Sequence, residues 1–445
     1  MTPNKPWTAV RKALTAATVI STVTLLSATA GAPCSSYTVY AWKSPASPQG
    51  NLTWDAAGNL YSTTNVGGAN DAGTVFELSP RTSGGWTEKI LHNFPKVSEL
   101  NNGTDGSFPG AGVIFDAAGN LYGTTSEGGN GGYPGGICTF PEEEPCGVVF
   151  ELSPTASGGW TEKILLNFNG GDGGYPYGGL IFDAAGNLYG TTLYGGDCIT
   201  NDIGCGVVFE LSPAADGKWN ETVVHSFPAT ATDGYFPYAG VIFDAVGNLY
   251  GTTYAGGAYG SEGGGIGYGM VFELSRTASG DWTEKTLHNF EGPPTDGWSP
   301  NGLTFDAAGN LYGTTFGGGT HADGTVFKLE RNSDGSWTEK ILLNFNGGDG
   351  GNPHGGLIFD AAGNLYGTTN QGGDLSCNTP YGCGTVFKLS PDTDGQWTES
   401  VLHRFWDTPG AYPTAGLVFD KAGNLYGTSE GDAKKTFGSV IEIVR

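Results

Sequence analysis

The chain has 445 residues and a formal net charge of −24 at pH 7, and 78 of its residues are Gly. Phosphate backbones and anionic membrane surfaces bind clustered Lys and Arg, so this composition excludes nucleic acid and such membrane surfaces as partners. The glycines recur at fixed positions among Leu, Val, Phe, Tyr and Trp, which excludes a low-complexity chain.

Residues 1–30 differ from the rest of the chain. Three basic residues precede an acid-free, apolar run that ends in Ala-Thr-Ala at 28–30. This pattern is typical of a secretory signal peptide with a small-residue cleavage site. A membrane anchor is the alternative, but the run is short and rich in Thr for a spanning helix. We expect a secreted protein, located in the periplasm, outside the cell or on its surface. Residues 31–445 are expected to form one domain without a membrane span, and the protein is expected to be a monomer.

A phrase of the form D-x-x-G-N-L-Y occurs seven times, at spacings of 54 to 67 residues. Self-similarity at a roughly constant period is typical of repeat architectures. We expect its Asp to bond turn amides and assign it no functional role. The seven phrases begin at Asp55, Asp116, Asp183, Asp244, Asp306, Asp360 and Asp420.

The third repeat illustrates the four short strands expected in each unit. Segments 178–183 and 188–192 flank a Gly-Asn turn, and a Gly-rich loop leads to 206–212, where apolar residues alternate with period two. Segment 219–227 is aromatic and β-branched, and no unit shows a helical period. Four antiparallel strands repeated seven times predict an all-β, seven-bladed β-propeller. The blades are expected to begin near residues 51, 112, 179, 240, 302, 356 and 416.

The two ends of the chain predict how the ring closes. The last unit ends at Arg445 with room for only three strands, whereas the aromatic segment 36–42 precedes the first unit without a blade of its own. We therefore expect 36–42 to be the fourth strand of the last blade, which removes free sheet edges. An open solenoid with a frayed last unit is the alternative.

The expected loops fall into two classes that define two faces of the propeller. The turns between first and second strands and between third and fourth strands have constant lengths. The loops between second and third strands vary, with 8 residues between Thr64 and Gly73 but 21 between Thr125 and Gly147. Loops that tolerate length changes are free to specialise, so we expect function on the variable face, around the mouth of the central channel.

Six of the seven cysteines lie in these variable loops. In a secreted protein, three closely spaced pairs predict disulfides that clamp the loops. Metal binding is the alternative, disfavoured by the absence of neighbouring His ligands. Cys34 remains as a free or intermolecular thiol. The expected pairs are Cys138 with Cys146, Cys198 with Cys205, and Cys377 with Cys383.

A D-G-x-x-P motif recurs in the links between blades, except in 43–50 and 406–413. Five carboxylates around a channel mouth would suit Ca²⁺ or a cationic ligand. The alternative, which we favour, is an Asp-Gly turn in which the carboxylate bonds its own backbone. These candidate ligand-binding residues are Asp105, Asp172, Asp233, Asp296 and Asp349.

The histidines separate into two groups. Four share one fourth-strand position that other units fill with Leu, which indicates packing: His92, His225, His288 and His403. His321 in a variable loop and His354 in a link are the candidate catalytic residues, with Asp349 as a partner in acid–base chemistry. Solvated loop histidines are the alternative. No Ser-His-Asp pattern, phosphate loop or zinc signature is present.

Aromatic residues near the links are a further candidate feature. They would offer stacking surfaces to a sugar or a peptide. The alternative is that they wedge neighbouring blades together. These residues are Tyr175, Tyr177, Tyr235, Phe236, Tyr238, Trp298 and Tyr412, and of them Tyr177, Tyr238 and Trp298 are taken as candidate ligand-binding residues.

The unit "GLIFDAAGNLYGTT…GTVFELSP…WTEKILHNF" resembles the GloVer tandem repeat of bacterial "choice-of-anchor" proteins, over nearly all of the mature chain. The resemblance implies an exported bacterial repeat protein. It does not identify catalytic residues. D-x-x-G-N-L-Y is also similar to the strand-turn phrase of NHL-type propellers and streptogramin lyases. A propeller hosts either binding or catalysis, so the fold leaves the activity open.

Three functions therefore stand as hypotheses. The first is a secreted propeller that binds a ligand such as a glycan or a peptide on its variable face. The second is an extracellular lyase or hydrolase that uses His354, His321 and nearby Asp residues with a divalent cation. The third is a structural or surface-interaction module.

Overall fold

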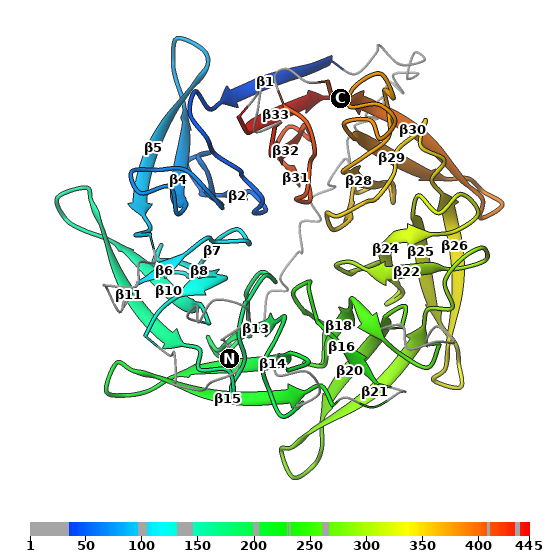
Figure 1. Ribbon diagram of the computed structural model, residues 1–445, viewed down its shortest axis with the longest axis horizontal. Coiled ribbons are helices and arrows are strands. Elements are labelled where there is room, and N and C mark those ends of the chain that lie inside the picture. Colours follow the sequence, from blue (N-terminus) through cyan, green and yellow to red (C-terminus); the bar gives the residue numbers. More distant parts are fainter. Residues whose placement is uncertain are drawn as a thin grey trace, which may run out of the picture. The chain divides into compact units, whose positions relative to one another are not determined.

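The computed structural model describes residues 35–96, 105–130, 146–198, 204–228, 230, 233–259, 267–406, 410–431 and 437–445. These residues form strands and turns, and seven sheets stand in a ring (Figure 1). The predicted seven-bladed β-propeller is thereby confirmed. No helix among the described residues is long and apolar enough to cross a membrane. The expected signal peptide lies outside these residues.

Each blade is an antiparallel sheet whose strands are ordered from the channel outward. The first three blades are β2 (Thr53–Trp54), β3 (Leu60–Thr64), β4 (Thr74–Pro80) and β5 (Trp86–Asn93); β7 (Ile114–Phe115), β8 (Leu121–Thr125), β10 (Val148–Pro154) and β11 (Trp160–Asn167); and β12 (Ile181–Phe182), β13 (Leu188–Thr192), β14 (Val207–Pro213) and β15 (Trp219–Ser226). Blades 4 to 6 are β17 (Ile242–Phe243), β18 (Leu249–Thr253), β20 (Met270–Arg276) and β21 (Trp282–Asn289); β23 (Thr304–Phe305), β24 (Leu311–Gly318), β25 (Thr325–Arg331) and β26 (Trp337–Asn344); and β27 (Ile358–Phe359), β28 (Leu365–Thr369), β29 (Thr385–Pro391) and β30 (Trp397–Arg404).

Blade 7 joins the two ends of the chain. Its strands are β31 (Val418–Phe419), β32 (Leu425–Ser429), β33 (Ser439–Val444) and β1 (Ser35–Ala41). β1 runs antiparallel to β33 from the Ser35–Val444 pair to the Ala41–Ser439 pair (Figure 1). The predicted closure by an N-terminal strand is confirmed, and the open solenoid is excluded.

Short strands in the links extend three of the blades toward the variable loops. They are β6 (Gly106–Ser107) with β9 (Glu127–Gly128), β16 (Gly234–Tyr235) with β19 (Ala255–Gly256), and β22 (Gly297–Pro300) with β24. Because these strands pair the links with the variable loops, both kinds of segment lie on one face, where we expected the site.

The core lies between blades. In one cluster, Phe209 and Leu211 of blade 3 are fully buried against Tyr122 and Phe168 of blade 2. The period-two alternation of the third strands places such residues on one sheet face, and each buried side chain contributes about 1.5–3 kcal/mol. A single blade cannot cover both of its faces, so the ring is the smallest unit that hides them all.

The innermost strands are shorter than the sequence suggested. Segment 178–183 was expected to be a strand, but only Ile181–Phe182 pairs with β13. The preceding glycines line the central channel instead of extending the ladder. The second, third and fourth segments of this unit match β13, β14 and β15 to within one residue at each end.

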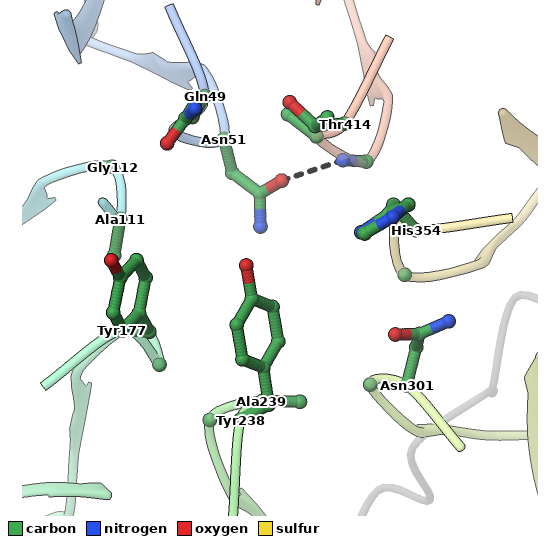
Figure 2. A pocket seen from close by; sticks show the side chains of 18 of the residues that line it. Gln49, Asn51, Ala111, Gly112, Tyr177, Tyr238, Ala239, Asn301, His354 and Thr414 are labelled. Carbon is green, nitrogen blue, oxygen red and sulfur yellow. Dashed lines mark hydrogen bonds between the residues drawn. The ribbon is translucent and has the colours of Figure 1, made fainter. Parts of the chain in front are cut away.

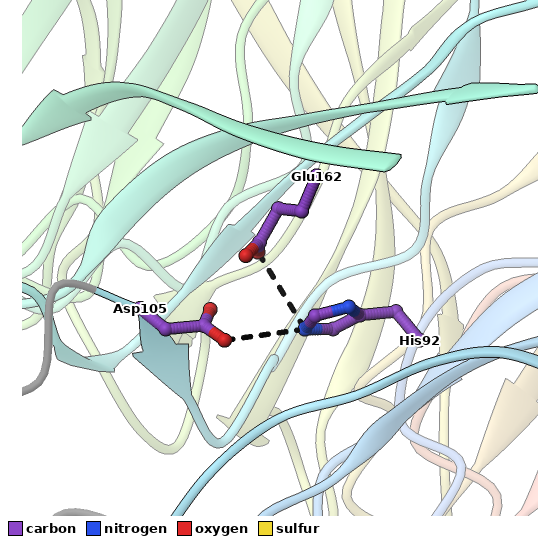
Figure 3. Close-up of side chains that lie close together, drawn as sticks. All are labelled: His92, Asp105 and Glu162. Atoms are coloured by element: carbon purple, nitrogen blue, oxygen red, sulfur yellow. Dashed lines mark ion pairs between the residues drawn. The ribbon is translucent and has the colours of Figure 1, made fainter. Parts of the chain in front are cut away.

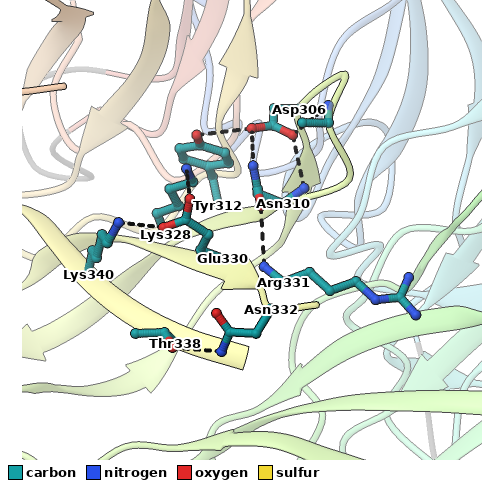
Figure 4. A network of polar contacts seen from close by, with 10 residues as sticks. Asp306, Asn310, Tyr312, Lys328, Glu330, Arg331, Asn332, Thr338 and Lys340 are labelled. Carbon is teal, nitrogen blue, oxygen red and sulfur yellow. Dashed lines mark hydrogen bonds and ion pairs between the residues drawn. The ribbon is translucent and has the colours of Figure 1, made fainter. Parts of the chain in front are cut away.

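The D-x-x-G-N-L-Y phrase forms a self-contained turn, as in blade 5 (Figure 4). Asp306 Oδ1 accepts the backbone N–H of Asn310 at 2.9 Å, and Oδ2 accepts Asn310 Nδ2 at 2.8 Å and the Tyr312 hydroxyl at 3.2 Å. Burial raises the pKa of Asp306, but these bonds outweigh it and bring the pKa below its usual value. The geometry matches the turn-forming role expected for this Asp.

Two of the predicted disulfides are present, Cys198–Cys205 and Cys377–Cys383. Cys146 is also disulfide-bonded, whereas Cys138 and Cys34 lie outside the described residues. Each described bridge closes a loop on the variable face, which restricts the unfolded chain.

Candidate functional site

The strongest departure from repetition lies where each inner strand begins. The residue after the link Pro is Gln49, Gly110, Tyr177, Tyr238, His354 and Thr414 in six blades, and blade 5 is one residue shorter there, with Asn301 after its Pro. All of these residues line one cavity of about 610 Å³ at the mouth of the channel. The blades otherwise share near-identical phrases, so this position gives the cavity its particular chemistry.

The walls of this cavity, which we call the channel-mouth cavity, consist largely of small residues. Gly or Ala follows the variable position in most blades, so backbone groups border the cavity directly. A volume of about 610 Å³ lies within the range of about 300–1,000 Å³ typical of small-molecule sites.

Two tyrosines form one side of the channel-mouth cavity. Tyr177 and Tyr238 stack with ring centroids 5.4 Å apart and an interplanar angle of 17°. Figure 2 shows the Tyr238 hydroxyl pointing toward Asn51 across the cavity. Burial raises the pKa of Tyr238 to about 12, so the hydroxyl is a neutral donor and acceptor at physiological pH.

Two amide side chains also line the cavity. Asn51 lies across from Tyr238, and Asn301 lies beside Tyr238 on the neighbouring blade (Figure 2). Asn51 Oδ1 accepts the backbone N–H of Gly416 at 2.7 Å, which turns its NH₂ group toward the cavity (Figure 2). Asn301 donates through Nδ2 to the carbonyl of Pro353 at 2.6 Å, so its oxygen faces inward. One amide therefore presents a donor and the other an acceptor.

Two titratable groups complete the lining. His354 packs edge-on against Phe316, and burial lowers its pKa, so its imidazole is neutral at pH 7. Burial raises the pKa of Glu430, which lies near Thr414 and Gln49. No Lys or Arg is among the described residues that line the cavity. The cavity thus presents aromatic faces and mostly uncharged hydrogen-bonding groups.

The other candidate catalytic residues do not meet in this cavity. His321 lies in an exposed loop, with Nδ1 3.0 Å from Thr320 Oγ1. Asp349 Oδ1 accepts the backbone N–H of Asn346 at 2.9 Å, outside the cavity. His354 is therefore separated from both of its expected partners. Trp298 packs against Phe316 with ring centroids 5.4 Å apart and does not line the cavity.

The five Asp residues of the D-G-x-x-P motifs lie between neighbouring blades. Each bonds local backbone, as Asp105 does by accepting the N–H of Gly106 at 2.7 Å. None lines the channel-mouth cavity. The ring of carboxylates envisaged around the channel is thus a set of separate positions at blade junctions.

Sequence reasoning missed Asn51, Asn301 and Glu430. A signal existed for Asn51, because the other six units have Gly at its position in "GLIFD"-type segments. An Asn that interrupts a column of glycines would be difficult to explain by packing alone.

Three solved structures are similar to this chain at low sequence identity. A gluconolactonase from Xanthomonas campestris has a TM-score of 0.37 and 17% identity, over 67% of this chain and 82% of its own. The extracellular domain of a candidate one-component system from B. thetaiotaomicron has a TM-score of 0.50 and 13% identity, over 92% of this chain and 42% of that chain. A protein of unknown function from Dyadobacter fermentans has a TM-score of 0.42 and 10% identity, over 92% and 98%. The likeness to the second structure, at a TM-score of 0.50 and 13% identity, concerns the fold alone.

No curated protein matches the chain in sequence. The Gloeobacter/Verrucomicrobia repeat model matches residues 34–263 and 259–444, which together cover the whole propeller. The repeated strand-turn phrase, the seven blades built from it and these two matches lead to one conclusion: the chain belongs to the Gloeobacter/Verrucomicrobia repeat family.

Proposed function

We propose that this propeller is an exported binding protein that holds a neutral, hydroxyl-rich ligand, such as a saccharide, in the channel-mouth cavity. The observation that carries the proposal is the break in repetition. Seven near-identical blades differ at the residue that faces this cavity, which a purely structural ring would not require.

The chemistry of the lining supports the choice of ligand. Stacked Tyr177 and Tyr238 offer an apolar face of the kind that covers sugar C–H groups, and Asn51 and Asn301 offer a donor and an acceptor to hydroxyls. The lining has no described cation to neutralise a phosphate or a carboxylate. A neutral ligand is therefore favoured over an anionic one.

Export is part of the same proposal. Disulfides persist in oxidising compartments, and two bridges clamp loops of the face that bears the cavity. The signal-like residues 1–30 agree with this location.

Binding of neutral mono- and oligosaccharides, measured by titration calorimetry, tests the proposal. For a saccharide that binds, Tyr238→Ala is expected to lower the affinity about tenfold or more, since loss of a stacking face costs about 1.4 kcal/mol or more. Tyr381→Ala is the matched control, because Tyr381 is 59% exposed in a variable loop outside the cavity and its loss should leave the affinity unchanged.

Three results would contradict the proposal: no saccharide binds, an anionic ligand or a peptide binds in preference, or the Tyr238→Ala and Tyr381→Ala variants behave alike. Turnover of a bound sugar that is abolished by His354→Ala would identify an enzyme, with the neutral His354 as its base.

A further inference from the structure

A second set of polar side chains lies at the junctions between blades, away from the channel. The outer strand of one blade supplies a His, the link that follows supplies the D-G-x-x-P Asp, and the outer strand of the next blade supplies the Glu of its W-x-E segment. Figure 3 shows the first such cluster, His92, Asp105 and Glu162. Two more are described, His225 with Asp233 and Glu284, and His288 with Asp296 and Glu339.

The distances from the imidazoles to the neighbouring carboxylates are longer than those of ordinary hydrogen bonds. His92 Nε2 lies 3.4 Å from Asp105 Oδ2 and 3.6 Å from Glu162 Oε1. The corresponding distances from His288 are 3.4 and 3.5 Å. A hydrogen bond from N–H to O is about 2.9 Å long, whereas two ligands about 2.1 Å from a tetrahedral ion lie about 3.4 Å apart. In the His92 and His288 clusters the spacing therefore matches that of two ligands bound to one metal ion. In the third cluster His225 Nε2 lies 3.5 Å from Glu284 Oε2, and Asp233 lies farther away, within 4.8 Å.

The imidazole nitrogens that face the acids are buried and without hydrogen-bond partners. This holds for Nε2 of all three histidines. One carboxylate oxygen, Oε1, of each cluster Glu is unpaired as well, as it also is in Glu221 and Glu399 at the junctions that have no His. A buried polar atom left unpaired costs about 1–3 kcal/mol, so a fold that repeats the arrangement three times requires a compensating partner. One proton shared by the two carboxyl groups would satisfy the oxygens and leave the imidazole nitrogen unbonded. A cation would satisfy all three groups at once.

The carboxylates are already oriented for such a ligand. Asp105 Oδ1 and Asp233 Oδ1 each accept the N–H of the following Gly at 2.7 Å, which fixes the carboxylate plane. Fixing the ligands through outer contacts of this kind is the usual support of a metal site.

We propose that the three His–Asp–Glu clusters are inter-blade sites for a divalent transition-metal ion, Zn²⁺ by the nature of the ligands. One imidazole and two carboxylates match the nitrogen and oxygen donors that Zn²⁺ accepts, and two negative charges balance the ion. Since the ligands come from two blades and the link between them, a bound ion would hold neighbouring blades together.

The remaining junctions of the ring provide internal controls. Leu166 and Leu343 occupy the His position at two junctions, beside the acidic pairs Asp172–Glu221 and Asp349–Glu399. Burial raises the pKa of Glu221 and Glu399 to about 8, as it raises that of Glu162 to about 9 and that of Glu284 to about 8 in two of the clusters. The clusters therefore differ from these junctions in the buried imidazole nitrogen that they add.

At a third junction the His is present, but Pro409 stands at the Asp position of the D-G-x-x-P motif. His403 borders a small cavity with Ser36 and Gly410. The last junction has the Glu alone, and Glu88 there accepts hydrogen bonds from Tyr40 and Trp42. The ring therefore has metal-type clusters only where His, Asp and Glu coincide among the described residues.

The test is a Zn²⁺ titration of the whole purified protein after treatment with EDTA, with stoichiometry from calorimetry and ligation from the visible spectrum of the Co²⁺ form. We expect three ions per chain and a rise in Tm with Zn²⁺. His92→Leu, His225→Leu and His288→Leu should each remove one ion, and the triple variant all three. Leu occurs at this position in two natural blades, so these variants are expected to fold.

Two further variants sharpen the test. His403→Leu is the matched control and should leave three ions, whereas Leu166→His should create a fourth site beside Asp172 and Glu221. The proposal is overturned if Zn²⁺ fails to bind saturably, if binding survives the triple variant, or if His403→Leu lowers the stoichiometry as His92→Leu does. Calcium binding that is indifferent to the histidines would also overturn it.

Discussion

The closing strand depends on hydrogen bonds that can be removed one at a time. The Tyr40 hydroxyl donates to Glu88 Oε2 at 2.8 Å, and Trp42 Nε1 donates to Glu88 Oε1 at 2.6 Å. These bonds join β1 and the residue that follows it to the outer strand of blade 1. Tyr40→Phe removes one of them and keeps the aromatic ring.

The structure sets the size of the effect. A hydrogen bond to a charged group contributes about 1.5–3 kcal/mol, and Tyr40 and Glu88 are only partly buried, so we expect about 1.5 kcal/mol for Tyr40→Phe. Trp42 also packs edge-on against Phe76 with centroids 5.1 Å apart. Both bonds end on Glu88, so their effects are coupled, and the double variant Tyr40→Phe/Trp42→Phe should lose more stability than Tyr40→Phe alone.

Urea unfolding gives the change in free energy, and hydrogen exchange of the β1 amides reports whether the strand detaches before the ring unfolds. Tyr37→Phe is the control, because Tyr37 lies on the same strand and is 56% exposed. Equal stability of the Tyr40→Phe and Tyr37→Phe variants, with unchanged exchange of β1, would refute this account of closure.

Two further predictions concern the acidic pairs and the loops. Burial and repulsion by Asp172 raise the pKa of Glu221 to about 8, so the folded chain holds a proton that the unfolded chain releases near pH 4.5. The free energy of unfolding should therefore fall as the pH rises from about 4.5 to 8. Thermal unfolding scans of Glu221→Gln should show a weaker dependence of stability on pH. The same dependence in the variant and the parent protein would contradict this prediction. Gly384 has a φ of +96° and a Cβ there would lie 2.2 Å from Thr369 O, whereas Gly363 has a φ of +82° with nothing within 4 Å. Gly384→Ala should therefore be more destabilising than Gly363→Ala, which costs only about 1 kcal/mol of backbone strain. The urea unfolding midpoints of the two variants measure the difference. Similar losses of stability in the two variants would refute the steric argument.

Sequence reasoning went furthest where the repeat itself varies, and a functional role for the residues that it singled out stays a prediction. Tyr177, Tyr238 and His354 stood out at a link position that changes from unit to unit, and the fold gathers them around one cavity. Prediction stopped at residues whose partners come from distant units. Asn51 bonds Gly416, 365 residues away, and no local pattern indicates that pair.

The histidines of the outer strands show why such partners were missed. Their position also accepts Leu, which indicated packing, and His92 does pack against Phe94 with centroids 4.7 Å apart. The same ring presents Nε2 to Asp105 and Glu162 from the link and the next blade. The Glu of the W-x-E segment, which recurs at one position in the outer strands of blades 1 to 6, was the signal that the sequence offered for this second contact.

The sequence by itself determined the strands, their turns, the number of blades and the closing strand. These features follow from contacts between residues near one another in the chain, and from counting strands at its two ends. Only the tertiary structure decided which side chains meet across blades. The ring brings together segments that are about 50 to 365 residues apart, and the channel-mouth cavity and the inter-blade clusters exist only where such segments converge. A local pattern can specify each face of a blade, but the neighbouring blade determines what that face contacts.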